Sequence, residues 1–281
     1  LVKANPYPQG LDDAKTRELT EMTKTKTPSL RGDWVTFAAS KPPLYHKLLE
    51  LPEKVGNLGA DKAIELKLGV NTERAEANGD VTKAGFKKSN VTKSNRVIDA
   101  HETPFGFYWK SDDFKTAEGK QNIFDHPRDY DRNGGEFIFN LPNGLQGYLV
   151  VDAAGNRLDE APTDIVVDPL RLDKNGAVVN GISCISCHTK GMKRKDDEIL
   201  PHFLRLEDTV RRENTLNRKR EDLLKDIDFV KRTYKDNKTL NRTYAEGERI
   251  YAEAIKRTGG DINDEEPVFA TTRAFEAPLD M

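Results

Sequence analysis

The sequence has few of the residues that most often build metal sites. It contains only two cysteines, three methionines and five histidines among its 281 residues. Two cysteines cannot form a four-cysteine zinc site. A mixed zinc site would need Cys184, Cys187, His188 and His202, and that spacing is not the spacing of a usual zinc finger.

Long apolar runs and an excess of one charge are also absent. The 45 basic and 47 acidic side chains leave a formal charge of −2, which argues against a global field that would attract nucleic acid or an anionic membrane. No apolar run approaches the ~18 residues of a membrane span. The mean hydropathy of −0.73 is polar, but plentiful aromatic side chains argue against a disordered chain. We therefore expect one large domain or two small ones, with no transmembrane segment and no nucleic-acid partner.

Both cysteines fall in one short run, Cys184-Ile185-Ser186-Cys187-His188. This is the C-x-x-C-H pattern of covalent c-type haem attachment. Two thiols three positions apart can form thioether bonds to the two vinyl groups on one edge of a haem. The next residue then lies beneath the porphyrin, where the His188 imidazole can bind iron as the proximal ligand. The sequence therefore predicts one haem c, held by Cys184, Cys187 and His188.

A redox C-x-x-C of the thioredoxin type is one alternative for this run, and a chance match with inert thiols is another. A thioredoxin-type motif follows a buried strand and opens a helix in a βαβ unit. Here Val178-Val179-Asn180-Gly181 precedes the first cysteine, and a histidine follows the second. We favour haem attachment because both cysteines of the chain belong to the pattern.

The motif also predicts a compartment. Haem c is attached after export, so we expect a periplasmic or extracellular protein. The chain begins at Leu1, and we expect it to be a mature or trimmed form. Its last residues read as mid-chain sequence, so we expect further sequence after Met281.

Amphipathic spacing predicts helices on both sides of the centre. Before it, helices are expected at 11–22, 33–39, 44–49, 61–68 and 71–77. After the motif, helices are expected at 201–212, 217–235 and 243–258. Gly69 and Gly259-Gly260 are expected helix stops. The remainder of 70–95 is expected to be loop.

The centre of the chain is rich in aromatic and β-branched residues. The aromatic run 104–110 is followed by runs at 135–141 and 146–152, with Pro142-Asn143-Gly144 between the last two. Two such runs joined by a tight turn predict an antiparallel hairpin. Its aromatic side chains would form either an ordinary core or the wall of a haem pocket.

The second axial position of a haem iron decides redox potential and reactivity. Small class I cytochromes c use a methionine far downstream, but here the nearest one, Met192, follows His188 closely and is expected on the proximal side. His101 lies beside the aromatic run and is remote from the motif. We therefore predict His101 as the distal iron ligand, followed by His202 and then an open position.

Five segments carry a family resemblance. They are 96–103 (RVIDAHET), 108–114 (YWKSDDF), 121–127 (QNIFDHP), 134–148 (GGEFIFNLPNGLQGY) and 180–188 (NGISCISCH). Together they resemble a family of secreted bacterial mono-haem cytochrome c-like proteins. The resemblance implies one haem c on Cys184, Cys187 and His188, and places histidines at His101 and His126. It implies no particular substrate or partner.

We expect an α+β fold, mainly helical with a small antiparallel β-hairpin module. The predicted regions are a helical and loop region at 1–95, an aromatic β module at 96–172 and a haem c-binding helical region at 173–281. The last two could also form one unit, 96–281. A class I cytochrome c fold cannot account for the long segment before the motif. A cytochrome c-like fold is therefore expected only for the haem-bearing C-terminal part.

The predicted function is single-electron transfer by an exported mono-haem cytochrome, which requires a redox partner protein. One alternative is a haem enzyme of peroxidase or small-ligand-binding type, with Arg96 or His101 as its acid–base partner. Another is a structural subunit of an extracellular complex, with the haem as a core staple. A calcium site is a weaker hypothesis, because the spacing fits no EF-hand. Its ligands would be Asp125, Asp129, Asp131 and Glu136.

Overall fold

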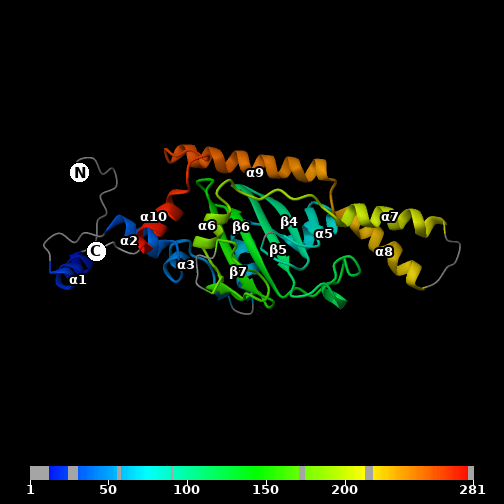
Figure 1. The fold of residues 1–281 in the computed structure, drawn as a ribbon, viewed down its shortest axis with the longest axis horizontal. Helices are drawn as coiled ribbons and strands as arrows, with labels where there is room; N and C mark the ends of the chain where they lie inside the picture. The colour runs from blue at the N-terminus through cyan, green and yellow to red at the C-terminus, as the bar shows by residue number, and fades with distance from the viewer. Residues whose placement is uncertain are drawn as a thin grey trace.

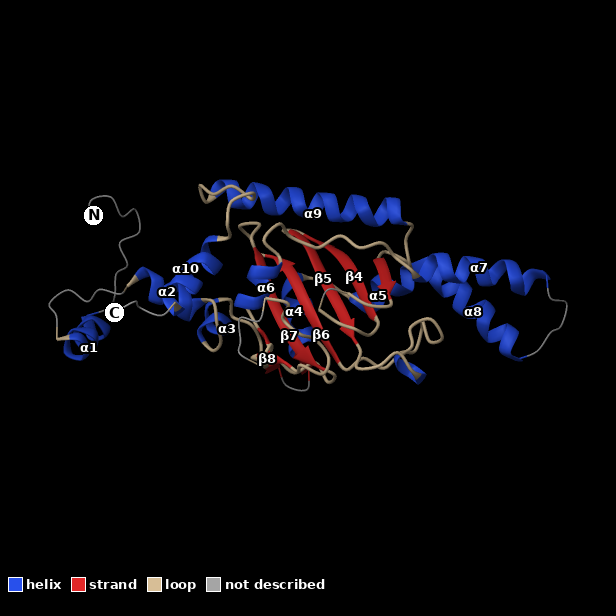
Figure 2. Cartoon of the chain, viewed as in Figure 1, coloured by secondary structure: helices blue, strands red, loops and turns tan. Residues whose placement is uncertain are grey.

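A five-stranded antiparallel sheet forms the centre of the protein. The structure is a computed structural model that describes residues 13–24, 31–55, 58–89, 91–170, 175–212 and 218–277. The strands neighbour one another in chain order, and Figure 2 shows them as one layer surrounded by helices. They are β3 Thr82–Phe86, β4 Arg96–Thr103, β5 Gly106–Asp113, β6 Gly134–Asn140 and β7 Gln146–Asp152.

One face of the sheet, which we call the α9 face, packs against helix α9 (Asn237–Arg257). The register places Trp109 of β5 opposite Ile138 of β6, and Ile138 opposite Tyr148 of β7. Directly opposed residues point to the same side of a sheet, so these three belong to one face. The Trp109 ring stacks on Tyr244 of α9, with ring centroids 5.2 Å apart. In Figure 1, α9 runs along the top of the sheet.

The opposite side, which we call the α4 face, packs against helix α4 (Ala60–Leu68). Tyr108 alternates with Trp109 and therefore points to this side. Its hydroxyl donates to Oε1 of Glu65 in α4 at 3.3 Å. Arg132 bridges the same helix to the sheet, because it contacts Asp61 of α4 at 2.5 Å and Asp112 of β5 at 3.2 Å. The two faces are thus covered by different helices: α4 precedes the five strands in the chain, and α9 follows them.

The main hydrophobic cluster draws on all three regions predicted from the sequence. It includes Tyr45 from the first region, Phe137 and Leu149 from the second, and Leu240 from the third. A second cluster joins Val97 of the sheet to the two helices α7 (Ile199–Arg212) and α8 (Arg218–Thr233). Burial of these side chains is the main force that holds the layers together.

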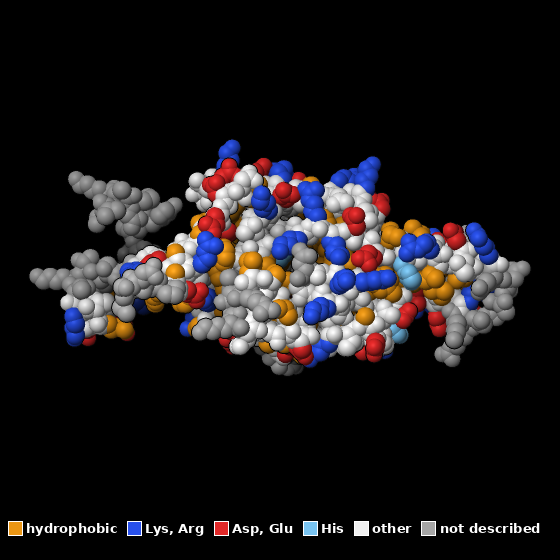
Figure 3. Space-filling model, viewed as in Figure 1, with side chains coloured by type: hydrophobic (Ala, Val, Ile, Leu, Met, Phe, Trp, Pro, Cys, Tyr) orange, Lys and Arg blue, Asp and Glu red, His pale blue; other side chains and the backbone are white. Residues whose placement is uncertain are grey.

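Helix pairs extend the molecule at both ends of the sheet (Figure 1). At one end, α2 (Gly32–Ala39) packs on α10 (Pro267–Glu276), where the rings of Phe37 and Phe275 lie 4.9 Å apart. At the other, α7 and α8 project as a hairpin. In Figure 3, apolar side chains gather over the α7–α8 end, and Lys and Arg are interspersed with Asp and Glu over the visible face. Over the residues that the structure describes, every helix is too short or too polar to cross a membrane.

Short elements complete the described chain. Helices α1 Asp13–Thr23, α3 Leu44–Leu48, α5 Thr72–Asn78 and α6 Ile182–Cys187 accompany a 3-10 turn, η2 Gly119–Gln121. Two small sheets pair β1 Lys54–Val55 with β2 Leu58–Gly59, and β8 Glu160–Ala161 with β9 Val178–Val179.

The α+β class and the hairpin of β6 and β7 are confirmed. The expected loop at 70–95 is wrong in part, because β3 lies within it and pairs with β4. That β4 begins at Arg96 also went unpredicted, since a strand buried on both faces lacks clear alternation. Residues 11, 12 and 217 of the expected helices, and Met281, lie outside the described residues. Of the C-terminal helices, α9 covers the sheet, and α10 packs on both α2 and the motif helix α6.

Candidate functional site

The C-x-x-C-H run forms helix α6 and its C-terminal cap. The helix begins after Gly181, whose φ is +97°. A Cβ at this position would lie 2.4 Å from the Ser40 carbonyl oxygen and 3.0 Å from Cγ of Tyr45. Glycine is therefore required both by the backbone angle and by the close contact with the segment before α3. The run can approach the rest of the fold only because this residue has no side chain.

The two thiols lie on one side of α6, because residues three apart in a helix are neighbours on its surface. Cys184 is 1% exposed and Cys187 is partly exposed. Burial raises the pKa of Cys184 well above its ordinary value, and it raises the pKa of Cys187 to about 11. A redox C-x-x-C needs a thiol with a lowered pKa. These thiols stay protonated, so the geometry does not favour the thioredoxin alternative.

His188 ends the helix and is oriented by its own loop. The backbone N–H of His188 donates to the carbonyl of Cys184 at 2.8 Å. Its ring Nδ1 lies 3.1 Å from the carbonyl oxygen of Gly191. A carbonyl only accepts, so Nδ1 carries the proton and Nε2 presents its lone pair. Burial lowers the pKa of His188, which keeps the ring neutral and able to bind a metal ion.

A large pocket opens between α6 and the α9 face of the sheet. It holds about 1070 Å³ of space free of protein atoms, part of it open to solvent. Counted as the space open to the centres of water molecules, its volume is about 130 Å³. Cys184, Cys187 and His188 all line it. Its apolar walls include Phe86, Ile98, Val150, Ile165, Val178 and Met192.

Three charged side chains of the sheet point into the pocket. Arg96 of β4 binds Asp113 of β5 through two hydrogen bonds, Nε to Oδ1 at 2.5 Å and Nη2 to Oδ2 at 3.0 Å. Nη2 also lies 3.5 Å from Oε2 of Glu136 on β6. The other oxygen of Glu136, Oε1, lies 3.9 Å from Nε2 of His188. Burial opposes the charge on Arg96, but Asp113 offsets this and raises the pKa of the guanidinium above its usual value.

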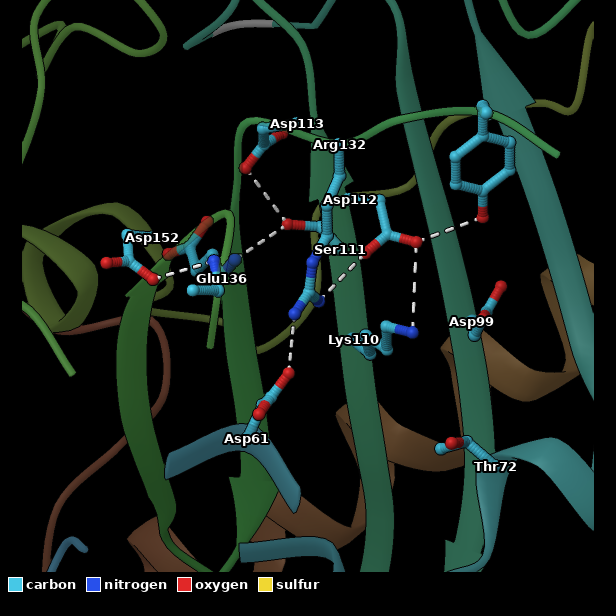
Figure 4. A network of polar contacts seen from close by, with 12 residues as sticks. Asp61, Thr72, Asp99, Lys110, Ser111, Asp112, Asp113, Arg132, Glu136 and Asp152 are labelled. Carbon is cyan, nitrogen blue, oxygen red and sulfur yellow. Dashed lines mark hydrogen bonds and ion pairs between the residues drawn. The ribbon is translucent and has the colours of Figure 1, made fainter. Parts of the chain in front are cut away.

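Backbone and hydroxyl groups hold these carboxylates in place. The Ser111 hydroxyl donates to Oδ2 of Asp113 at 3.2 Å, and it accepts the backbone N–H of Glu136 at 3.0 Å. Figure 4 shows Asp113, Ser111 and Glu136 together on neighbouring strands. Burial raises the pKa of Asp113 despite its contact with Arg96. The pocket thus has a polar floor held by the sheet, and further polar side chains line it elsewhere: Ser89, Asp168, Ser183, Lys193, Arg194 and Lys195.

The structure does not bring His101 to this pocket. His101 is paired with Tyr108 in the register and points to the α4 face, whereas Arg96, Ile98 and the pocket lie on the α9 face. Its ring contacts Tyr108, with centroids 6.1 Å apart. The layer of backbone that separates the two faces rules out His101 as a ligand to an iron held by His188. The distal-ligand prediction for His101 is therefore corrected.

The other candidate residues are spread over the molecule. His202 packs on Phe124 at the base of α7, and His126 lies 3.2 Å from Asp129. His46 is buried, and its Nε2 accepts from the Asn180 side chain at 2.8 Å. None of these three lines the pocket, whereas Met192 does. The aromatic run 104–110 packs mainly under α9 rather than around the motif.

The geometry supports neither the zinc site nor the calcium site considered from the sequence. Within the described ranges, no three His, Cys, Asp or Glu side chains cluster in a way that could hold a metal ion. Glu136 points into the pocket, away from the expected calcium loop, where Asp125 accepts from Asn122. A zinc site with His202 is excluded by its distance in the fold from the pocket.

Sequence reasoning missed the position of Glu136 against His188. Glu136 was named only as a calcium candidate, although the alternation of β6 offered a signal. Phe137 and Phe139 occupy one face, so Glu136 must occupy the other. Which face would meet α6 depends on tertiary packing.

No protein-family model, no curated protein and no solved structure matches the chain.

Proposed function

We propose that this chain is an exported mono-haem c-type cytochrome that transfers single electrons. The observation that supports it best is one pocket lined by both thiols and by a neutral imidazole with a free Nε2. The apolar side chains of the pocket wall suit a haem, and the raised thiol pKa values fit a structural attachment rather than a reactive dithiol. The mode of attachment implies a periplasmic or extracellular location.

The residues divide the work of holding the group. Each thiol would add across one vinyl double bond, forming a carbon–sulfur bond while the thiol hydrogen passes to the neighbouring carbon. His188 Nε2 would bind the iron, and the Gly191 carbonyl fixes the ring orientation through Nδ1. The haem would supply the one-electron couple of its iron.

The residues around the pocket would control how water and a redox partner reach the haem. Side chains such as Ile98, Val150 and Val178 keep water from the pocket wall. Cys184 is buried and Cys187 is partly exposed, so the Cys187 side faces a redox partner. Electron transfer at one iron needs no second substrate. This agrees with a pocket in which Arg96, Asp113 and Glu136 form one polar group.

The proposal is tested by haem content. The chain, exported through a bacterial cytochrome c maturation system, should gain the mass of one haem that survives acid–acetone extraction. It should also give a pyridine haemochrome spectrum and a reversible one-electron reduction. His188→Ala should keep the added mass but lose the native spectrum. An intact chain without added mass, whose two thiols both react with an alkylating agent, would contradict the proposal.

A second candidate is a haem enzyme of peroxidase or small-ligand-binding type. It is favoured by one observation: among the described residues that line the pocket, His188 is the only histidine, and Arg96 supplies a cation nearby. An iron with an exchangeable position would bind cyanide and carbon monoxide at once. Turnover of peroxide with an electron donor, at a rate far above that of free haem, would move this candidate ahead of electron transfer.

A further inference from the structure

The distance between His188 and Glu136 matches the span of one bound metal ion. Bonds from imidazole nitrogen and carboxylate oxygen to a first-row metal such as zinc are about 2.0–2.2 Å long. One ion bound by both atoms on opposite sides therefore spans about 4 Å. Nε2 of His188 and Oε1 of Glu136 are 3.9 Å apart. In a haem, the macrocycle supplies the four remaining ligands, so these two donors would complete the coordination of the iron.

Resting on the proposed haem attachment, we propose that Glu136 is the sixth ligand of the iron, bound through Oε1 opposite His188. This assigns the distal position to a carboxylate of β6. The site predicted from the sequence, His101, is on the other face of the sheet.

The carboxylate is positioned for this role by the sheet. Its backbone N–H is held by Ser111, and its second oxygen, Oε2, faces Nη2 of Arg96 at 3.5 Å. Arg96 is itself fixed by two hydrogen bonds to Asp113. The Glu136 side chain is 16% exposed, so little solvent is available to compete. Oε1 thus lies on the His188 side of the pocket, where the Glu136 carboxylate also faces the Cys184 thiol.

Charge provides an independent argument. Arg96 is the one cation in contact with both Asp113 and Glu136, whose side chains are 4% and 16% exposed. Within this group of three, two carboxylates face one guanidinium, and buried charges need partners. Ferric iron in a porphyrin retains one positive charge after the four ring nitrogens are counted. Such a centre beside Glu136 would place a positive charge next to the carboxylate that shares its cation with Asp113.

Met192 is the remaining competitor in the pocket. It follows Gly191, whose carbonyl accepts from Nδ1 of His188. The two ring nitrogens point to different sides, so the 188–192 loop lies on the side away from Nε2. Met192 therefore belongs to the proximal wall, and it provides a matched control for the distal assignment.

The experiment compares ligand variants of the full chain after haem attachment. Glu136→Gln should remove the carboxylate signature from the ferric spectrum and tighten cyanide binding at least about tenfold, because no anionic ligand competes. It should also raise the midpoint potential, since an anion stabilises ferric iron. Glu136→His should give a low-spin bis-histidine spectrum, a gain that a merely structural residue would not produce.

Two control variants accompany the Glu136 variants. Met192→Leu and Glu102→Gln, the latter an exposed glutamate on β4, should leave the spectrum and cyanide affinity unchanged. The assignment is overturned if Glu136→Gln behaves as wild type, or if Met192→Leu is the variant that opens the iron. Should the Glu136 variants fail to mature, near-infrared magnetic circular dichroism of the wild-type protein decides, since methionine or histidine bands would refute a carboxylate. Absence of haem in the wild-type chain would instead refute the proposed function itself.

Discussion

The imidazole of His188 and the carboxylate of Glu136 face each other across 3.9 Å, although they belong to a short helix and a central strand. His101 lies on a neighbouring strand but on the opposite face, where its Nε2 is buried without a hydrogen-bond partner in the described structure. At this scale, the direction of a single side chain decides which residue can reach the pocket beside His188.

The first prediction at the residue scale concerns His101→Gln. The variant should leave the haem spectrum unchanged, because residue 101 points to the α4 face. Absorption spectra of the ferric and ferrous forms would check it. A switch to a high-spin spectrum would restore His101 as the distal ligand and contradict the register described above.

The same variant should change the pH dependence of stability. Burial lowers the pKa of His101 from its ordinary 6.5, so below pH 6.5 the unfolded chain takes up a proton more readily than the folded one. The free energy of unfolding therefore falls as pH decreases from 6.5 towards the folded pKa. His101→Gln should make that decrease shallower in urea titrations at several pH values. His126→Gln, at a partly exposed position, serves as the control, and an equal slope in wild type and His101→Gln would contradict the argument.

At the scale of elements, α6 is placed by one glycine. Gly181→Ala should lower the free energy of unfolding by about 2 kcal/mol or more, from backbone strain and from the clash with Ser40 and Tyr45. Haem incorporation should fall with it. Gly69→Ala isolates the contribution of backbone angle, because Gly69 has φ +71° but nothing within 4 Å of the added Cβ. Urea unfolding should rank Gly181→Ala as the more costly change, and an equal cost would show that packing against α6 is loose.

Helix α4 is tied to the sheet by Arg132, which lies between Asp61 and Asp112 (Figure 4). Arg132→Ala should lower the free energy of unfolding by about 3–5 kcal/mol, because it leaves buried carboxylates without their partner. The matched control is Arg249→Ala, which removes an equally well-formed but exposed pair of contacts on α9. That control should be nearly neutral. Comparable losses in the two variants would show that the α4 face is open to water.

At the scale of the whole molecule, the pocket is shared by α6, the sheet, residues 161–169 and Val178. The double variant Cys184→Ser/Cys187→Ser cannot attach haem and should leave this apolar space unfilled. Its melting temperature should fall by at least about 10 °C, equivalent to roughly 3–5 kcal/mol for a chain of this size. Circular dichroism of the haem-bearing and haem-free chains would measure the shift. Equal melting temperatures would argue against any role of haem as a core staple.

The sequence by itself determined which residues of the motif lie together. Cys184, Cys187 and His188 follow one another within a single helical turn, so their proximity is a local property of the chain. Helix α4 ended at Gly69 as predicted, and the turn after Asn140 joined β6 to β7, because caps and hairpin turns are also local.

Tertiary structure alone decided which side chains of the sheet face the motif. Strands β3 and β4 are stabilised by pairing with partners, and no short-range pattern in 82–103 revealed them. Alternate residues of a strand point to opposite faces, and this can be read from the sequence. The docking of α6 on the α9 face, however, determined that Glu136 and Arg96, and not His101, would lie near the motif. A displacement of β4 by one residue would turn Arg96 to the α4 face and His101 to the α9 face, and only the packed sheet excludes it.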